Sequence, residues 1–144
     1  TGNQEIDGVL NYMLQKANET LNQVDVQINI PEDLYFNNFN ICVILGNLVD
    51  NAVREASKSK EKLLTIKMQI KQEVLLIFIE NSYSGKILEK RNGLQTTQPE
   101  LAIHGIGLEN VKKVVIANGG EIKIDYTSNR FCVQVLLYMS RIKN

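Results

Sequence analysis

Apolar residues along the chain follow two spacings, one typical of amphipathic helices and the other of half-buried strands. Steps of three and four residues, which place side chains on one helical face, occur in three segments. Alternation of apolar and polar residues, which is typical of a strand with one buried face, occurs in four more. The expected helices cover residues 6–21, a stretch from Asn37 or Asn38 to about 56, and 108–117, and the expected strands cover residues 24–30, 64–70, 122–126 and 131–137.

Residues 74–79 are almost entirely apolar, which predicts a strand in the middle of a sheet. Only Gln72 and Glu73 separate this segment from the preceding strand, so the two strands are expected to form a hairpin. Because the strands gather in hairpins toward the C-terminal half, we expect an α+β fold. Its form would be a two-layer α/β sandwich, with about three helices on one face of a mixed, mostly antiparallel five-stranded sheet. Residues 1–144 form a single expected domain, of which 1–22 are the N-terminal helix.

The composition is that of an ordinary globular protein with balanced charge. Sixteen Lys and Arg residues and sixteen Asp and Glu residues give a formal net charge of zero, so nucleic acid is not an expected partner. Cys42 and Cys132 each lie within an apolar run, and we expect both to be small core residues in a reducing compartment. The longest apolar run, 74–79, is too short to cross a bilayer. This fragment is therefore expected to be soluble, cytoplasmic and without membrane contact, whereas a parent protein could be membrane-anchored.

The middle helix contains two asparagines one turn apart, Asn47 and Asn51, which share a face. Two amides on one face beside an aspartate, Asp50, can supply oxygen ligands to a hard divalent cation that also holds phosphate oxygens. A pattern this short is also typical of a polar strip on a surface helix, and alone it favours that interpretation.

A second polar motif follows the buried strand, with Asn81 at the strand's end and Gly85 shortly after it. A polar side chain at a strand end can read the edge of a base, and a glycine lets the backbone approach a ligand closely. An Asn-Ser turn that only ends the strand is the simpler interpretation of this segment taken alone.

The third motif contains Gly105 and Gly107 and leads through Leu108 into the last helix. Such glycines let backbone N–H groups turn toward an anion, and the helix N-terminus adds partial positive charge. A dinucleotide-binding Rossmann motif is excluded, because the third glycine is missing and a long loop, residues 81–104, stands where a strand should precede it. Loops longer than about 15 residues in a compact domain are usually functional or disordered.

Together and in this order, the three motifs resemble those of the GHKL superfamily of ATPases and kinases. Its asparagine box resembles residues 47–51, its first glycine box residues 81–85, and its second glycine box Gly105 and Gly107. The opening helix and the strand that ends at Pro31 also resemble the quorum-sensing-type sensor histidine kinases of bacteria. The resemblance implies the Bergerat fold, ATP and Mg²⁺ as cofactors, and the role of a catalytic domain in a two-component signalling kinase.

The resemblance further implies one ATP site built from all three motifs and covered by a lid. Asn51 is expected to coordinate Mg²⁺, Asn47 to position the phosphates, and Asn81 to contact the adenine amino group. Backbone amides of the second glycine box are expected to bind phosphate. The expected nucleotide-binding residues are Asn47, Asn51, Arg54, Asn81, Gly85, Gly105, Gly107 and Leu108, and the expected lid is 86–103.

Asn47 stands where the ATP-hydrolysing relatives have a glutamate that activates water. An amide cannot accept a proton near neutral pH, so Asn47 is expected to act in catalysis by positioning the phosphates and not as a general base. The domain should therefore transfer the γ-phosphate to another nucleophile, with catalysis by positioning and charge neutralisation. That nucleophile is expected to be a histidine on a separate dimerisation helix, because His104 directly precedes the phosphate-binding glycines.

Two residues depart from the family pattern in the first glycine box. Asn81 replaces the usual aspartate, and Tyr83 replaces a usual glycine. A neutral amide is a weaker hydrogen-bond acceptor than a carboxylate, so weak ATP binding is expected.

Two alternative functions remain open. One is a non-catalytic pseudo-kinase module that binds nucleotide weakly or not at all and acts through protein contacts. The other is a serine kinase that inhibits a sigma factor, which would phosphorylate a partner's serine. For the histidine kinase, the implied partners are the dimerisation and phosphoacceptor helices of the same kinase and, indirectly, a response regulator, with the full-length protein as a homodimer.

Overall fold

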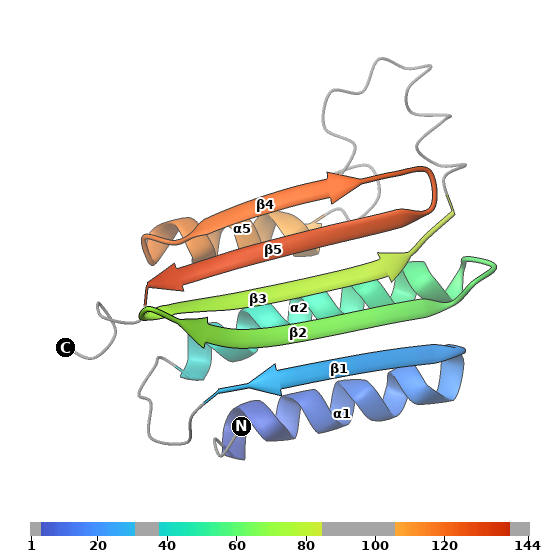
Figure 1. Ribbon diagram of the computed structural model, residues 1–144, viewed down its shortest axis with the longest axis horizontal. Coiled ribbons are helices and arrows are strands. Elements are labelled where there is room, and N and C mark those ends of the chain that lie inside the picture. The colour runs from blue at the N-terminus through green and yellow to red at the C-terminus, as the bar shows by residue number, and fades with distance from the viewer. Residues whose placement is uncertain (1–3, 31–37, 85–105, 139–144) are drawn as a thin grey trace.

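In the part of the chain that the structure describes, five strands form a single mixed sheet, and three helices cover one of its faces (Figure 1). The computed structural model describes residues 4–30, 38–84 and 106–138. In chain order the elements are α1 (Gln4–Thr20), β1 (Gln23–Asn29), α2 (Asn38–Ser57), β2 (Leu63–Lys71), β3 (Val74–Ser82), α5 (Ile106–Ala117), β4 (Glu121–Tyr126) and β5 (Arg130–Tyr138). The α+β sandwich predicted from the sequence is confirmed.

The strand order across the sheet is β1-β2-β3-β5-β4. β1 and β2 run parallel, with α2 as the connection between them, whereas every other neighbouring pair is antiparallel. β3 is the central strand, as its apolar sequence predicted. The predicted β2–β3 hairpin is also confirmed, and both of its turn residues, Gln72 (φ 53°) and Glu73 (φ 65°), adopt left-handed conformations that suit the twist of the strands.

The hydrophobic core lies between the three helices and the sheet face that they cover. Inward-facing residues of neighbouring strands, such as Ile66, Ile77 and Val135, are fully buried. α2 lies between α1 and α5 and packs against β2 and β3, so Ile44 and Leu45 are also fully buried. None of the described helices is both long and apolar enough to span a bilayer.

The expectation that both cysteines belong to the core is correct only for Cys42, which packs against the core from α2. Cys132 lies between two buried neighbours on β5, Phe131 and Val133, and therefore points to the opposite, open face of the sheet. Partial burial there, with smaller contributions from nearby carboxylates, raises the pKa of the Cys132 thiol to about 11. An apolar run alone does not show which of its residues face the core.

Candidate functional site

A hydrogen bond between two asparagines sets the position of α5 along α2. Asn40 Nδ2, near the start of α2, donates to Asn118 Oδ1, just after the end of α5, at 3.1 Å. The two helices therefore run antiparallel, as Figure 1 also shows. The same number of residues separates Asn40 from Asn51 and Asn118 from Gly107. Since each helical residue rises about 1.5 Å, the N-terminus of α5 lies level with Asn51.

A second contact joins the end of α2 to the end of β3. The hydroxyl groups of Ser59 and Ser82 lie 2.7 Å apart and are buried. Asn81, directly before Ser82, pairs in the sheet with Leu64 and Phe131, two core residues. Its side chain therefore faces the helices, and it is only 2% exposed.

These two contacts bring residues from all three motifs to one end of the molecule. In Figure 1 the second half of α2 and the end of β3 lie toward the right, and the start of α5 is the end of that helix nearer to them. Gly107 lies in the first turn of α5, and Leu108 is buried in the core beneath it. Gly85, Gly105 and the expected lid, 86–103, lie outside the described residues.

Asn51 is the most unusual polar residue of this region. Its side chain is 5% exposed, and its Nδ2 atom is buried without a hydrogen-bond partner among the described residues. Leaving a buried donor unpaired costs about 1–3 kcal/mol. Its Oδ1 accepts a hydrogen bond from Arg54 Nη2, while Arg54 Nη1 lies 3.9 Å from Asp50 in an exposed ion pair.

The residues present fit a magnesium ion only if the nucleotide supplies further ligands. Among the described residues, no group of three His, Cys, Asp or Glu side chains could hold a metal by itself. The Asn51 carbonyl oxygen is the hard donor that Mg²⁺ prefers, and Mg²⁺ usually completes its shell with waters and phosphate oxygens. Because Arg54 is bonded to that oxygen in this structure, a metal ion would have to displace its guanidinium group.

Asn47 lies on the same flank of α2 as Asn51, one turn earlier. Its Nδ2 donates to the Val43 carbonyl of its own helix at 2.9 Å. This bond fixes the orientation of the amide and leaves its oxygen as the acceptor toward the site.

Tyr83, which replaces a family glycine, does not adopt a glycine-like backbone. The described non-glycine residues with positive φ are Lys62, Gln72 and Glu73, and Tyr83 is not among them. Its ring is buried and packs edge-on against Phe131, with centroids 6.0 Å apart. Its hydroxyl donates to the Thr127 carbonyl, and burial raises the pKa of that hydroxyl. The side chain thus fastens the end of β3 to the β4–β5 turn.

Glu55 is a polar residue of this region that sequence reasoning missed. It is 4% exposed, and burial raises its pKa, against smaller opposing effects of Lys58 and Arg54. The available signal was its spacing, because Glu55 lies one helical turn after Asn51 on the same flank.

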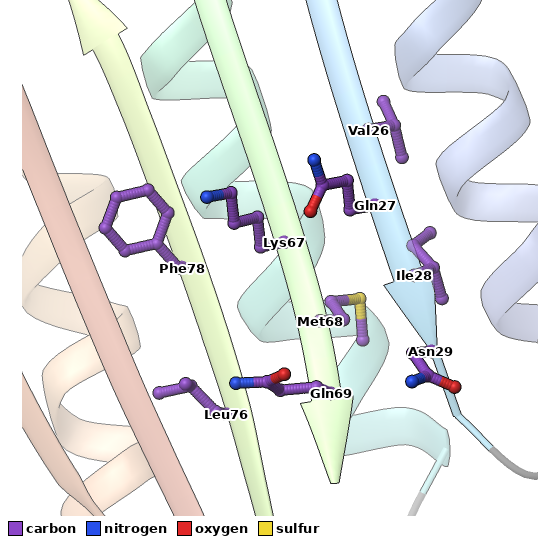
Figure 2. Close-up of a pocket in the computed structure, with 9 residues that line it drawn as sticks. All are labelled: Val26, Gln27, Ile28, Asn29, Lys67, Met68, Gln69, Leu76 and Phe78. Atoms are coloured by element: carbon purple, nitrogen blue, oxygen red, sulfur yellow. The ribbon is translucent and has the colours of Figure 1, made fainter.

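An open groove of about 660 Å³ lies elsewhere, over β1, β2 and β3 (Figure 2). Polar side chains such as Gln27, Lys67 and Gln69 line it beside Phe78, over which Lys67 Nζ lies 5.6 Å from the ring centroid. None of the motif residues lines this groove. The groove is therefore separate from the candidate nucleotide site.

Comparison with known proteins agrees with the fold and with the superfamily that the motifs resemble. Residues 36–138 match the family described as GHKL domain. No curated protein sequence matches the chain significantly.

Several solved structures share the fold at low sequence identity. The Acinetobacter baumannii histidine kinase AdeS has a TM-score of 0.67 and 19% identity, over 94% of this chain and 64% of that one. The mycobacterial sensor histidine kinase MprB has a TM-score of 0.61 and 17% identity, over 92% of this chain and 93% of that one. Full-length ShkA in complex with AMPPNP has a TM-score of 0.63 and 15% identity, over 91% of this chain and 29% of that one.

The chain thus spans 64% of AdeS and a smaller part of full-length ShkA. The similar structures establish the fold, while the match over residues 36–138 covers most of the chain and all three motifs. The family and fold expected from the motifs are confirmed, although nothing distinguishes a quorum-sensing-type kinase from other members. The chain belongs to the GHKL family.

Proposed function

We propose that this domain binds Mg–ATP between α2, the start of α5 and the end of β3, and transfers the γ-phosphate to a histidine on a separate dimerisation helix. The observation that carries the proposal is the buried Asn51 amide, which lacks a full set of partners and lies level with the N-terminus of α5. Buried polar groups are usually hydrogen-bonded, so an unpaired buried donor of this kind suits a site where a ligand supplies the missing partner.

The phosphates would lie between Asn51 and the start of α5. Backbone N–H groups of Gly105, Gly107 and Leu108, together with the helix N-terminus, would bind them. Mg²⁺ held by Asn51 Oδ1 would neutralise phosphate charge. Once displaced from Asn51, the Arg54 guanidinium could bind a phosphate oxygen.

The base would lie at the other end of the site, beside Asn81. Asn81 Nδ2 already donates to the Ser82 carbonyl at 2.8 Å, which orients Oδ1 as the remaining acceptor. That oxygen can accept a hydrogen bond from the adenine amino group.

The identity of Asn47 favours phosphoryl transfer over rapid ATP hydrolysis. Its amide cannot activate water, so the bound triphosphate would persist until a nucleophile arrives from another helix. Histidine kinases are among the structures with this fold, and another structure with this fold, full-length ShkA, is a complex with AMPPNP. A homodimeric parent kinase and a downstream response regulator complete the proposal.

Calorimetry of the purified domain tests the binding step. ATP would be titrated with and without Mg²⁺ into the wild type, Asn51→Ala and the control Asn11→Ala, an exposed asparagine on α1. Binding that requires Mg²⁺ and weakens at least about tenfold only in Asn51→Ala supports the proposal. No binding at millimolar ATP by the folded wild type would contradict it.

A non-catalytic module is the second candidate, and the hydrogen bond from Arg54 to Asn51 favours it, because it covers the oxygen that a metal needs. The two candidates differ in phosphotransfer. Labelled ATP would be incubated with the domain and a dimerisation helix that carries a histidine or, in the control, a glutamine. Label on the histidine supports the kinase, whereas nucleotide binding without transfer supports the module, and label on a partner's serine would indicate a serine kinase.

A further inference from the structure

Glu55 is a buried carboxylate at the candidate site that none of the roles above uses. Its side chain is 5% exposed, although glutamate is seldom buried without a partner. Its one ion pair among the described residues is with Lys58, whose largely exposed Nζ lies 3.9 Å from Oε1, which is too long for a hydrogen bond. Within residues 4–30, 38–84 and 106–138, no donor lies at hydrogen-bond distance from this carboxylate.

The position of Glu55 places it toward the base end of the site. It lies one turn beyond Asn51 and one turn before Ser59. Because Ser59 is bonded to Ser82, this last part of α2 lies at the end of β3. Asn81, the neighbour of Ser82, faces the helices there. Glu55 and Asn81 are thus buried polar residues on the two layers that bound the same end of the site.

We propose that Glu55 supplies the charged hydrogen-bond acceptor for the exocyclic amino group of adenine. This inference rests on the proposed function, because it needs a nucleotide in the site. The amino group carries two hydrogens, and Asn81 Oδ1 can accept only one of them. A carboxylate that accepts the other makes a bond roughly twice as strong as a neutral amide does. The negative charge that the first glycine box lacks is thereby present on α2.

The neighbouring donor and acceptor support a ligand as the missing partner. Asn51 has a buried donor without a partner, and Glu55, one turn away, is a largely buried carboxylate whose ion pair with Lys58 is longer than a hydrogen bond. The two groups do not bond to each other, so both remain available to a molecule that enters the site. A glutamine at position 55 would have nearly the same shape without the cost of a desolvated charge.

The amino group itself can be removed from the ligand as a test. Calorimetry would compare Mg–ATP with the magnesium complex of purine riboside 5′-triphosphate, which differs from ATP only by the absence of that group. The proteins would be the wild type, Glu55→Gln and the control Glu19→Gln, which removes an exposed negative charge from α1. Thermal unfolding would show that each variant is folded.

Glu55→Gln is expected to weaken Mg–ATP binding about tenfold and to leave binding of the purine analogue within about twofold of wild type. Glu19→Gln should change neither the affinity for Mg–ATP nor that for the analogue. The wild type should prefer ATP over the analogue by about tenfold or more, and Glu55→Gln should lose most of that preference.

Equal affinity of the wild type for the two nucleotides would overturn the role of Glu55. The role would also be overturned if Glu55→Gln bound ATP with wild-type affinity, or if the variant lost affinity for ATP and for the analogue to the same extent. In each of those cases, binding that still requires Mg²⁺ and Asn51 would leave the proposed Mg–ATP site intact, and equal affinity would remove only the contact of Asn81 with the amino group. No nucleotide binding by the wild type would overturn both proposals.

Discussion

The hydroxyl groups of Ser59 and Ser82 lie 2.7 Å apart, and this buried pair joins the end of α2 to the end of β3. Ser82 Oγ also accepts from the Leu63 backbone N–H at 2.8 Å, and Ser59 Oγ accepts from that of Lys62 at 3.1 Å. The pair therefore satisfies the backbone of the α2–β2 connection while it fixes the strand end that carries Asn81. Stability and the shape of the base end of the site depend on the same contact.

Ser82→Ala should destabilise the domain by about 1–3 kcal/mol, because the buried Ser59 hydroxyl and the half-buried Leu63 N–H lose a partner. Urea denaturation measures the loss. The matched control is Ser57→Ala, since Ser57 Oγ donates to the Arg54 carbonyl in an exposed bond. A similar loss in both variants would show that the buried contact contributes no more to the free energy of unfolding than an exposed hydrogen bond does.

Replacing Tyr83 by the glycine that the family usually has at this position should destabilise the domain. Tyr83→Gly removes a buried ring from Phe131 and a hydrogen bond to Thr127, so we expect a loss of about 3–5 kcal/mol in the free energy of unfolding. Tyr83→Phe removes only the hydroxyl and should cost about 1 kcal/mol. If Tyr83→Gly proved as stable as wild type, the tyrosine would not fasten β3 to the β4–β5 turn.

The sequence predicted what depends on local patterns and missed what depends on distant partners. Alternation and spacing report burial directly, so the central strand β3 and the turn at Gln72 and Glu73 were predictable. Tyr83 was visible as a departure from a glycine, but its contact with Thr127 depends on a hairpin more than forty residues away. Cys132 was misplaced because its position was judged from the apolar run alone, whereas the alternation predicted for residues 131–137 puts it on the face opposite Phe131 and Val133.

The candidate site shows the same division. Asn51 and Asn81 were predicted from their motifs, because each lies at a recognisable place on its element. The contact of Asn40 with Asn118, which sets α5 against α2, follows from no local pattern, since these residues are far apart in sequence. Glu55 was missed because glutamate on a helix is usually exposed, and only the tertiary structure shows that this one is buried.

Gly120 is the position where the α5–β4 connection should tolerate no side chain. A Cβ atom there would lie 2.4 Å from the Leu136 carbonyl oxygen and 2.9 Å from Leu137 Cδ2. Gly120→Ala should therefore destabilise the domain by about 1–3 kcal/mol in urea denaturation. Gly8→Ala on α1 is the control, because its Cβ would meet nothing within 4 Å, and it should stabilise the helix by about 0.5–1 kcal/mol. Equal effects of the two substitutions would contradict the close approach at Gly120.

Replacing Glu55 should change how stability depends on pH. Burial raises the pKa of this carboxyl above its ordinary value, with Lys58 and Arg54 opposing the shift. As pH rises from the unfolded-state pKa through the higher folded-state pKa, the unfolded chain releases its proton first. The folded state then binds more protons, so wild-type stability falls across that window. Above this pH window the loss of wild-type stability is constant, and below the window there is no loss.

Glu55→Gln has no such proton to lose. It should therefore be more stable than wild type at pH 7, and this advantage should disappear as pH falls below the ordinary glutamate pKa. Urea denaturation at several pH values measures the difference, with Glu19→Gln, an exposed residue, as the control that should stay flat. A Gln variant less stable than wild type at pH 7 would mean that the ionised carboxylate is stabilised in the folded protein without nucleotide. In that case a partner from the chain itself, and not a ligand, would explain why a glutamate stands at this position.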